Sequence, residues 1–78
     1  KQREYEKALA EFRAALLFDP TDTAALNGLG VCMMTKYIVA DRRVLAHHEE
    51  ALQAWQRSLE LRPNQPRIAA LVDQFARL

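Results

Sequence analysis

Two prolines, Pro20 and Pro63, constrain the fold of this chain more than any other feature. Each one follows a stretch whose apolar residues are spaced three and four positions apart, the period of a helix that buries one face. Proline lacks a backbone N–H and clashes with the preceding turn, so a helix is expected to stop before each of them. The two prolines lie 43 positions apart.

The first proline separates two predicted helices. The first helix is expected over residues 2–18, with an apolar face that includes Leu9 and Phe12. The second helix begins after Asp22, because its carboxylate can accept hydrogen bonds from the free N–H groups of a helix start. This second helix is expected to fade near Val39.

Two further helices are predicted in the second half of the chain. The third is expected to begin after Asp41, taken as its cap, and to end before Pro63. The fourth covers residues 66–76, with Pro66 in the first turn, where a missing N–H costs nothing. No segment alternates apolar and polar residues with period two, so we expect an all-α fold of about four helices.

The first and third predicted helices match when the sequence is shifted by 43 residues. A large residue meets a large one where Phe12 falls on Trp55, and a small residue meets a small one where Ala8 falls on Ala51. Repeats of this kind stack helix pairs into a solenoid, because a single pair cannot bury its own apolar face.

Three stretches show a more specific spacing of small, aromatic and proline residues. The first reads Tyr5-x-x-Ala8-x-x-x-Phe12-x-x-Ala15-x-x-x-x-Pro20. The second reads Leu26-x-x-Leu29-Gly30-x-x-Met33. The third reads Ala51-x-x-x-Trp55-x-x-Ser58-x-x-x-x-Pro63. In this order they resemble the second helix of one tetratricopeptide repeat (TPR) and both helices of the next, a helical hairpin of about 34 residues.

The resemblance implies how the chain is organised. Residues 1–20 would be the second helix of a preceding repeat, residues 21–63 one repeat with an elongated hairpin, and residues 64–78 a capping helix. The antiparallel hairpins would stack as a short right-handed superhelix. The chain begins within a helical pattern, so we expect it to be a fragment of a longer protein.

One stretch departs from the family pattern. Gly30 and Ala51 are 21 residues apart, where the repeat needs about 12. The extra residues fall around positions 36–46 and form either a loop or an extension of both helices. We favour the extension, because Tyr37 and then Val44-Leu45 continue the apolar stripes. Such a hairpin would extend beyond the neighbouring helices. The extension would be either a contact surface or additional length without a function.

The resemblance also implies a function, because members of the family usually bind extended peptides or helices on a concave face. The candidate peptide-binding residues share the side of two helices next to the core stripe: Ala24, Asn27, Val31, Met34, Arg67, Ala70, Gln74 and Arg77. The amide of Asn27 could hydrogen-bond a peptide backbone, and Arg67 and Arg77 could pair with acidic groups. The Lys and Asn set of the family's carboxylate clamp is absent, so binding of chaperone tails is not expected.

Two alternatives stay open. The lone first helix exposes an apolar face, so the chain could be a structural or oligomerisation element that self-associates as a homo-oligomer or scaffolds an assembly. It could also be a regulatory array attached to an enzyme. The main expectation remains a module whose partner is another protein or peptide.

The charge pattern argues against other partners. The chain has 11 basic and 10 acidic residues, whereas a nucleic-acid binder usually has a basic excess on one face. Arg42 and Arg43 make a small basic spot at the hairpin tip, but a solvated tip balanced by Glu49 and Glu50 is favoured over contact with phosphate. No apolar run reaches the roughly 18 residues of a membrane span, so no membrane insertion is expected.

No catalytic or metal site is expected either. His47 and His48 are adjacent, so on a helix they point about 100° apart and cannot bind one metal ion from the same face. His48 falls on the inner stripe and is expected to be packed and hydrogen-bonded. Cys32 is expected to be a small buried apolar residue. We therefore predict a non-enzyme without cofactors, and the single cysteine leaves the compartment open.

Overall fold

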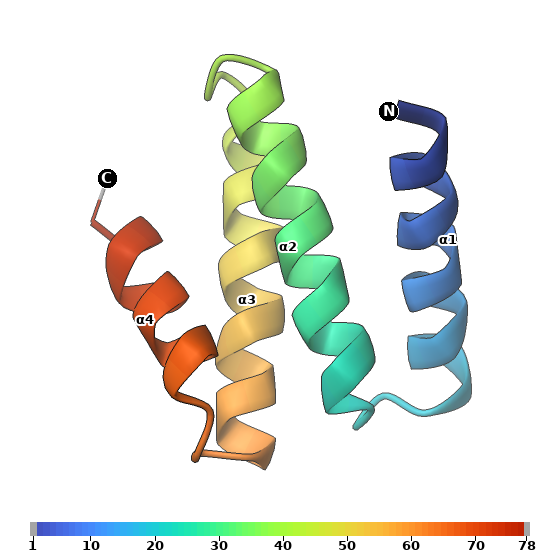
Figure 1. Ribbon diagram of the computed structural model, residues 1–78, viewed down its shortest axis with the longest axis vertical. Helices are drawn as coiled ribbons and strands as arrows, with labels where there is room; N and C mark the ends of the chain where they lie inside the picture. The colour runs from blue at the N-terminus through green and yellow to red at the C-terminus, as the bar shows by residue number, and fades with distance from the viewer. Residues whose placement is uncertain (1, 78) are drawn as a thin grey trace.

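The computed structural model describes residues 2–77, which form four helices arranged in a row (Figure 1). Each helix packs against the next one along the chain in antiparallel pairs. The bounds of the helices are α1 Gln2–Phe18, α2 Thr23–Val39, α3 Leu45–Leu61 and α4 Pro66–Phe75. The predicted all-α class and the predicted order of helices are confirmed. Residues 1 and 78, at the outer ends of the predicted segments, lie outside the described residues.

Most helix ends follow the sequence signals. Asp22 is the N-cap of α2, and its carboxylate accepts a hydrogen bond from the Ala25 N–H at 3.0 Å. This bond satisfies one of the N–H groups that a helix start leaves free. The α3 helix ends before Pro63, and α4 has Pro66 in its first turn.

The predicted role of Asp41 is wrong, because this residue closes α2 and does not start α3. Its N–H donates to the Ile38 carbonyl at 3.1 Å, and the Arg42 N–H donates to the Tyr37 carbonyl at 2.9 Å. These two bonds form the C-terminal motif in which the residue after the helix adopts a left-handed conformation. Asp41 has a φ of 57° and Arg42 a φ of 58°. The α3 helix instead begins after Val44, with no side-chain cap.

The core lies on both sides of α2, which packs against α1 and α3. Two glycines allow the closest approaches. The Trp55 indole lies against Gly30 and the Phe12 ring lies against Gly28, and a Cβ at either glycine would overlap these rings. Trp55 is only 1% exposed, and its indole N–H donates to the Asn27 carbonyl at 3.3 Å. Gly30, the small residue of the second motif, therefore allows a close approach between α2 and α3.

Two other predictions about buried residues are also confirmed. Cys32 is buried, as expected for a small apolar residue. His48 is buried too, with its Nε2 atom 2.8 Å from the Phe75 carbonyl oxygen and its ring 5.0 Å from the ring of Tyr37. His48 therefore links the start of α3 to the end of α4.

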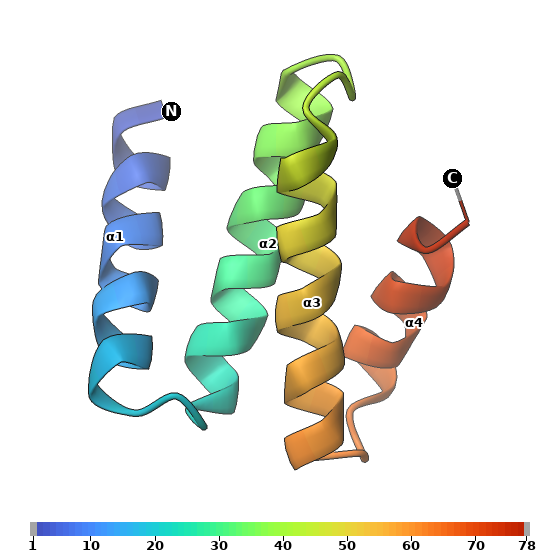
Figure 2. The ribbon, with the colours of Figure 1, turned by 180° about the vertical axis from the view of Figure 1, so that it is seen from behind.

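The hairpin of α2 and α3 is elongated by helix, as favoured from the sequence. Both helices have 17 residues, and their connection extends past the ends of α1 and α4 (Figures 1 and 2). Tyr37 continues the buried stripe, as predicted. Val44 and Leu45 do not, because no neighbouring helix reaches them and both are exposed. No helix among the described residues has both the length and the apolar character needed to cross a membrane.

Polar contacts hold α1 against the hairpin. The Tyr5 hydroxyl donates to the Cys32 carbonyl, and burial raises the pKa of Tyr5. The Arg13 guanidinium lies 2.6 Å from the Glu50 carboxylate, so it links α1 to α3. Lys36 forms a longer ion pair of 3.7 Å with Glu6.

Candidate functional site

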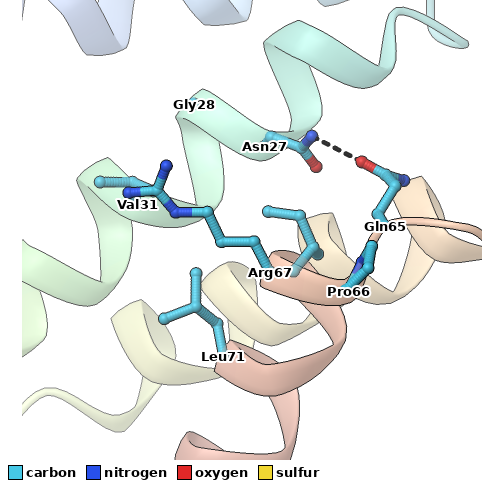
Figure 3. A pocket seen from close by; sticks show the side chains of 8 residues that line it. Asn27, Gly28, Val31, Gln65, Pro66, Arg67 and Leu71 are labelled. Atoms are coloured by element: carbon cyan, nitrogen blue, oxygen red, sulfur yellow. Dashed lines mark hydrogen bonds between the residues drawn. The ribbon is translucent and has the colours of Figure 1, made fainter.

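A groove of about 490 Å³ opens between α2 and the beginning of α4 (Figure 3). The α2 helix supplies one wall, and the turn before α4 and its first two turns supply the other. The lining residues are Asn27, Gly28, Val31, Gln65, Pro66, Arg67, Ile68 and Leu71. We refer to this feature as the α2–α4 groove.

One part of the α2–α4 groove is apolar. Val31 is 50% exposed on α2, and Leu71 is half-buried on α4. Ile68 is buried beneath them, and Gly28 adds no side chain to the wall. An apolar side chain of a ligand would therefore remove Val31 and Leu71 from water when it enters.

The other part of the groove is a hydrogen-bond network centred on Gln65. Its Nε2 atom donates to three oxygens: the Ser58 carbonyl at 3.1 Å, the Ser58 hydroxyl at 3.0 Å and the Arg62 carbonyl at 2.8 Å. Its Oε1 atom accepts from Asn27 Nδ2 at 2.8 Å (Figure 3). Because carbonyl oxygens only accept, the Gln65 amide nitrogen must face them, and Asn27 must present its own nitrogen to Gln65.

This arrangement leaves the other end of the Asn27 amide without a partner. Asn27 Oδ1 is buried and accepts no hydrogen bond within the described residues. A buried acceptor of this kind costs about 1–3 kcal/mol when it is left unsatisfied. A ligand that moves the groove lining enough to bring an N–H or O–H donor to this oxygen would recover this free energy.

Arg67 supplies the charge at the groove. Its side chain extends from α4 toward Val31 (Figure 3). It is exposed and forms no ion pair with any residue that the structure describes. The neighbouring Pro66 has no N–H. Gln65 is the N-cap residue of α4, but its side chain makes no capping bond and donates to Ser58 and Arg62 instead.

The structure brings together three of the eight predicted site residues. Asn27, Val31 and Arg67 line the α2–α4 groove. Four others are exposed but do not line it: Ala24, Ala70, Gln74 and Arg77. Arg77 already has an acidic neighbour, since its Nη2 atom lies 3.5 Å from the Asp73 carboxylate.

Met34 is a correction, because it belongs to the core. It is 3% exposed, although the sequence placed it beside the core stripe and facing the partner. The single apolar stripe in the sequence predicts only one buried face for α2. In the structure α2 packs between α1 and α3. Met34 is therefore buried although it lies beside the predicted core stripe.

Five residues of the groove were not predicted as site residues: Gly28, Gln65, Pro66, Ile68 and Leu71. No local pattern could have paired Gln65 with Asn27, because they are 38 positions apart. Gly28 did carry a signal, since glycine inside a helix costs about 1 kcal/mol and implies a close approach.

A second groove of about 310 Å³ lies between α1 and α2. It is lined by Arg13, Leu16, Leu17 and Leu29. Phe18 follows Leu17 and is 91% exposed, so the end of α1 presents large apolar side chains to solvent. This groove lacks the orphan acceptor that distinguishes the α2–α4 groove.

The titratable groups show no catalytic arrangement within the part of the chain that the structure describes. Burial raises the pKa of the Cys32 thiol, which keeps it protonated and weakly nucleophilic. His48 is engaged with the Phe75 carbonyl and a neighbouring ring. No group of three His, Cys, Asp or Glu side chains among the described residues could hold a metal ion.

Comparison with protein-family models, with curated proteins and with solved structures found no match to this chain. The TPR resemblance therefore rests on the residue spacing in the sequence.

Proposed function

We propose that this chain is a non-catalytic interaction module that binds a peptide or helix of a partner protein in the α2–α4 groove. In this proposal its four helices are a short TPR-like solenoid, and the groove is part of the concave face. The partner would be an apolar segment that carries backbone donors and an acidic group.

The packing of the two repeat copies supports the TPR-like interpretation. Phe12 and Trp55 occupy matching positions in the 43-residue shift. Each places its ring against a glycine of α2, Phe12 on Gly28 and Trp55 on Gly30. One helix thus receives the large residue of both copies, which is how stacked hairpins share a core.

The observation that carries the proposal is the orphan oxygen of Asn27 next to an apolar wall. A concave, mostly apolar surface with a few convergent polar groups is the usual composition of a binding site. A peptide supplies what the groove lacks: an N–H for Asn27 Oδ1, an apolar side chain for Val31 and Leu71, and a carboxylate for Arg67.

The test is selection of peptides from a random phage-displayed library, followed by titration of one selected peptide. We expect the variant Val31→Glu/Arg67→Glu to weaken binding at least about tenfold, because both side chains are exposed groove contacts. The matched control is Gln53→Glu/Arg57→Glu on exposed positions of α3, which makes the same change in charge. Equal binding by both variants would remove the groove assignment.

Substituting Asn27 tests a different part of the site. Asn27→Ala removes the orphan oxygen but also breaks the bond to Gln65, so a loss of stability accompanies any loss of affinity. The variant is therefore compared at a temperature where its circular dichroism equals that of the native chain. Under that condition we expect weaker binding, and unchanged affinity would mean that the ligand does not use this oxygen.

A second candidate function is self-association through the end of α1. The observation that favours it is the exposure of Leu17 and Phe18, at 88% and 91%. Large exposed apolar residues of this kind mark interfaces. A concentration-dependent dimer in sedimentation equilibrium, lost in Leu17→Glu/Phe18→Glu, would support this function. A monomer at all concentrations would exclude it.

A further inference from the structure

The tip of the α2–α3 hairpin, residues 38–45, displays more apolar surface than its position in the fold requires. Four of its aliphatic side chains are between 41% and 66% exposed: Ile38, Val39, Val44 and Leu45. They flank Arg42 and Arg43, which are exposed as well. This segment, which we call the hairpin tip, therefore combines aliphatic and cationic side chains within two helix ends and one turn.

The arginines of the hairpin tip form no ion pairs with described carboxylates. Glu50, expected from the sequence to balance them, is paired with Arg13 at 2.6 Å. Neither Arg42 nor Arg43 forms an ion pair with a described residue, and neither does Glu49. Asp41 is the single acidic residue of the tip, so the tip carries excess positive charge.

The turn between the helices holds these side chains at the apex. Asp41 and Arg42 both have positive φ angles, a conformation that is unfavourable for residues with a Cβ. Hydrogen bonds from the Arg42 N–H to Tyr37 and from the Arg43 N–H to Ala40, at 2.9 and 3.2 Å, maintain it. The apex extends past α1 and α4 in both views (Figures 1 and 2).

We propose that the hairpin tip docks on an anionic lipid surface, with its aliphatic side chains in the headgroup layer and Arg42 and Arg43 on lipid phosphates. Apolar groups at the acyl boundary and basic groups on anionic headgroups are the two signals that hold peripheral proteins on membranes. A bilayer deforms around a convex tip, whereas a rigid protein partner would need a matching hollow. The charge complementarity of two unpaired guanidinium groups selects an anionic surface.

The strength of the interaction follows from the size of the tip. Its four aliphatic side chains carry about as many carbons as one myristoyl chain, which alone gives only marginal and reversible binding. The arginines supply the second signal. Binding should therefore be reversible, require anionic lipid and weaken as salt screens the arginines.

The test is co-sedimentation of the chain with phosphatidylcholine vesicles, with and without phosphatidylserine, at low and high salt. We expect binding to the anionic vesicles only, and release by salt. Val39→Ser/Leu45→Ser should reduce binding at least about tenfold, and Arg42→Gln/Arg43→Gln should do the same. The matched control, Arg57→Gln/Arg62→Gln, removes two exposed arginines at the far end of α3 and should bind like the native chain.

Three results would overturn the proposal. The first is no binding to anionic vesicles at low salt, and the second is equal binding to both kinds of vesicle. The third is a lipid-independent dimer that Val39→Ser/Leu45→Ser abolishes, which would assign the hairpin tip to a second copy of the chain. All substituted side chains are exposed, so circular dichroism should show that every variant is folded.

Discussion

The two ends of the α2–α3 hairpin are built differently. At the base, where α3 turns into α4, the side chains of Asn27, Ser58 and Gln65 bond to one another beside the buried Trp55. At the hairpin tip, residues 38–45, the aliphatic side chains are exposed and the backbone turns through two positive φ angles. The base therefore stabilises the fold, whereas the tip exposes aliphatic side chains that are free to contact another molecule.

How far the flanking helices reach along the hairpin explains this difference. The α4 helix has 10 residues against 17 for α3, and its end reaches only as far as His48 through the Phe75 carbonyl. On the other side, the contacts of α1 extend to Lys36, which pairs with Glu6. Beyond these points the aliphatic side chains of the hairpin tip are exposed.

The largest expected difference in stability is between truncating an aromatic residue near the base and truncating an aliphatic residue at the tip. Trp55→Ala should lower the free energy of unfolding by about 3–5 kcal/mol, because it leaves a cavity and removes the bond to Asn27. Leu45→Ala should change it by no more than about 0.5 kcal/mol. Urea denaturation followed by circular dichroism measures both. Similar losses in the two variants would mean that the tip is part of the core.

The hydrogen-bond network at the base should be the next most sensitive feature. Gln65→Leu removes the partner of Asn27 and Ser58 and should cost about 1–3 kcal/mol, because buried polar groups are left unsatisfied. Gln74→Leu makes the same change at an exposed position of α4 and should be nearly neutral. If thermal melts of the two variants coincide, the Gln65 network does not stabilise the base.

Substitutions at the two glycines of α2 compare a tightly packed contact with one that can adjust. Gly30→Ala should destabilise by about 1–3 kcal/mol, because the added methyl overlaps the indole of Trp55, which is buried and hydrogen-bonded. Gly28→Ala should cost less, because the Phe12 ring is only half-buried and alanine favours the helix by about 1 kcal/mol. Chemical denaturation of both variants decides the order, and a larger loss at Gly28 would contradict it.

The two aspartates at the ends of α2 should respond in opposite directions. Asp22→Ala removes a cap and should destabilise by about 1 kcal/mol. Asp41→Gly should stabilise by up to about 1 kcal/mol, because glycine adopts a positive φ without the steric cost of a Cβ. Melting temperatures are sufficient to see the opposite signs. A destabilising Asp41→Gly would mean that the carboxylate of Asp41 holds the turn.

Most of the fold could be predicted because its signals are local. Pro20 and Pro63 mark where α1 and α3 end, and Asp22 caps α2 as expected. Asp41 could not be assigned in the same way, because aspartate suits both a helix start and a left-handed residue after a helix end. The bond to the Tyr37 carbonyl that decides between them depends on where α2 stops.

The candidate site was less predictable because it depends on tertiary contacts. Val31 and Arg67 follow from helix periodicity, and both line the groove. The role of Gln65 does not follow from periodicity, because it arises from a turn that brings this residue against Asn27 and Ser58. The prediction for Met34 was wrong for a related reason. A helix packed on two sides has less exposed surface than its single apolar stripe implies.

An NMR titration of the ¹⁵N-labelled chain with a selected peptide shows residue by residue which end of the hairpin binds the peptide. We predict that the amide signals of Gly28, Val31, Ile68 and Leu71 shift, while those of residues 38–45 stay in place. The side-chain amide of Asn27 should move with the groove signals, because its free oxygen gains a donor. Shifts confined to the hairpin tip or to the groove beside Leu17 would contradict the account.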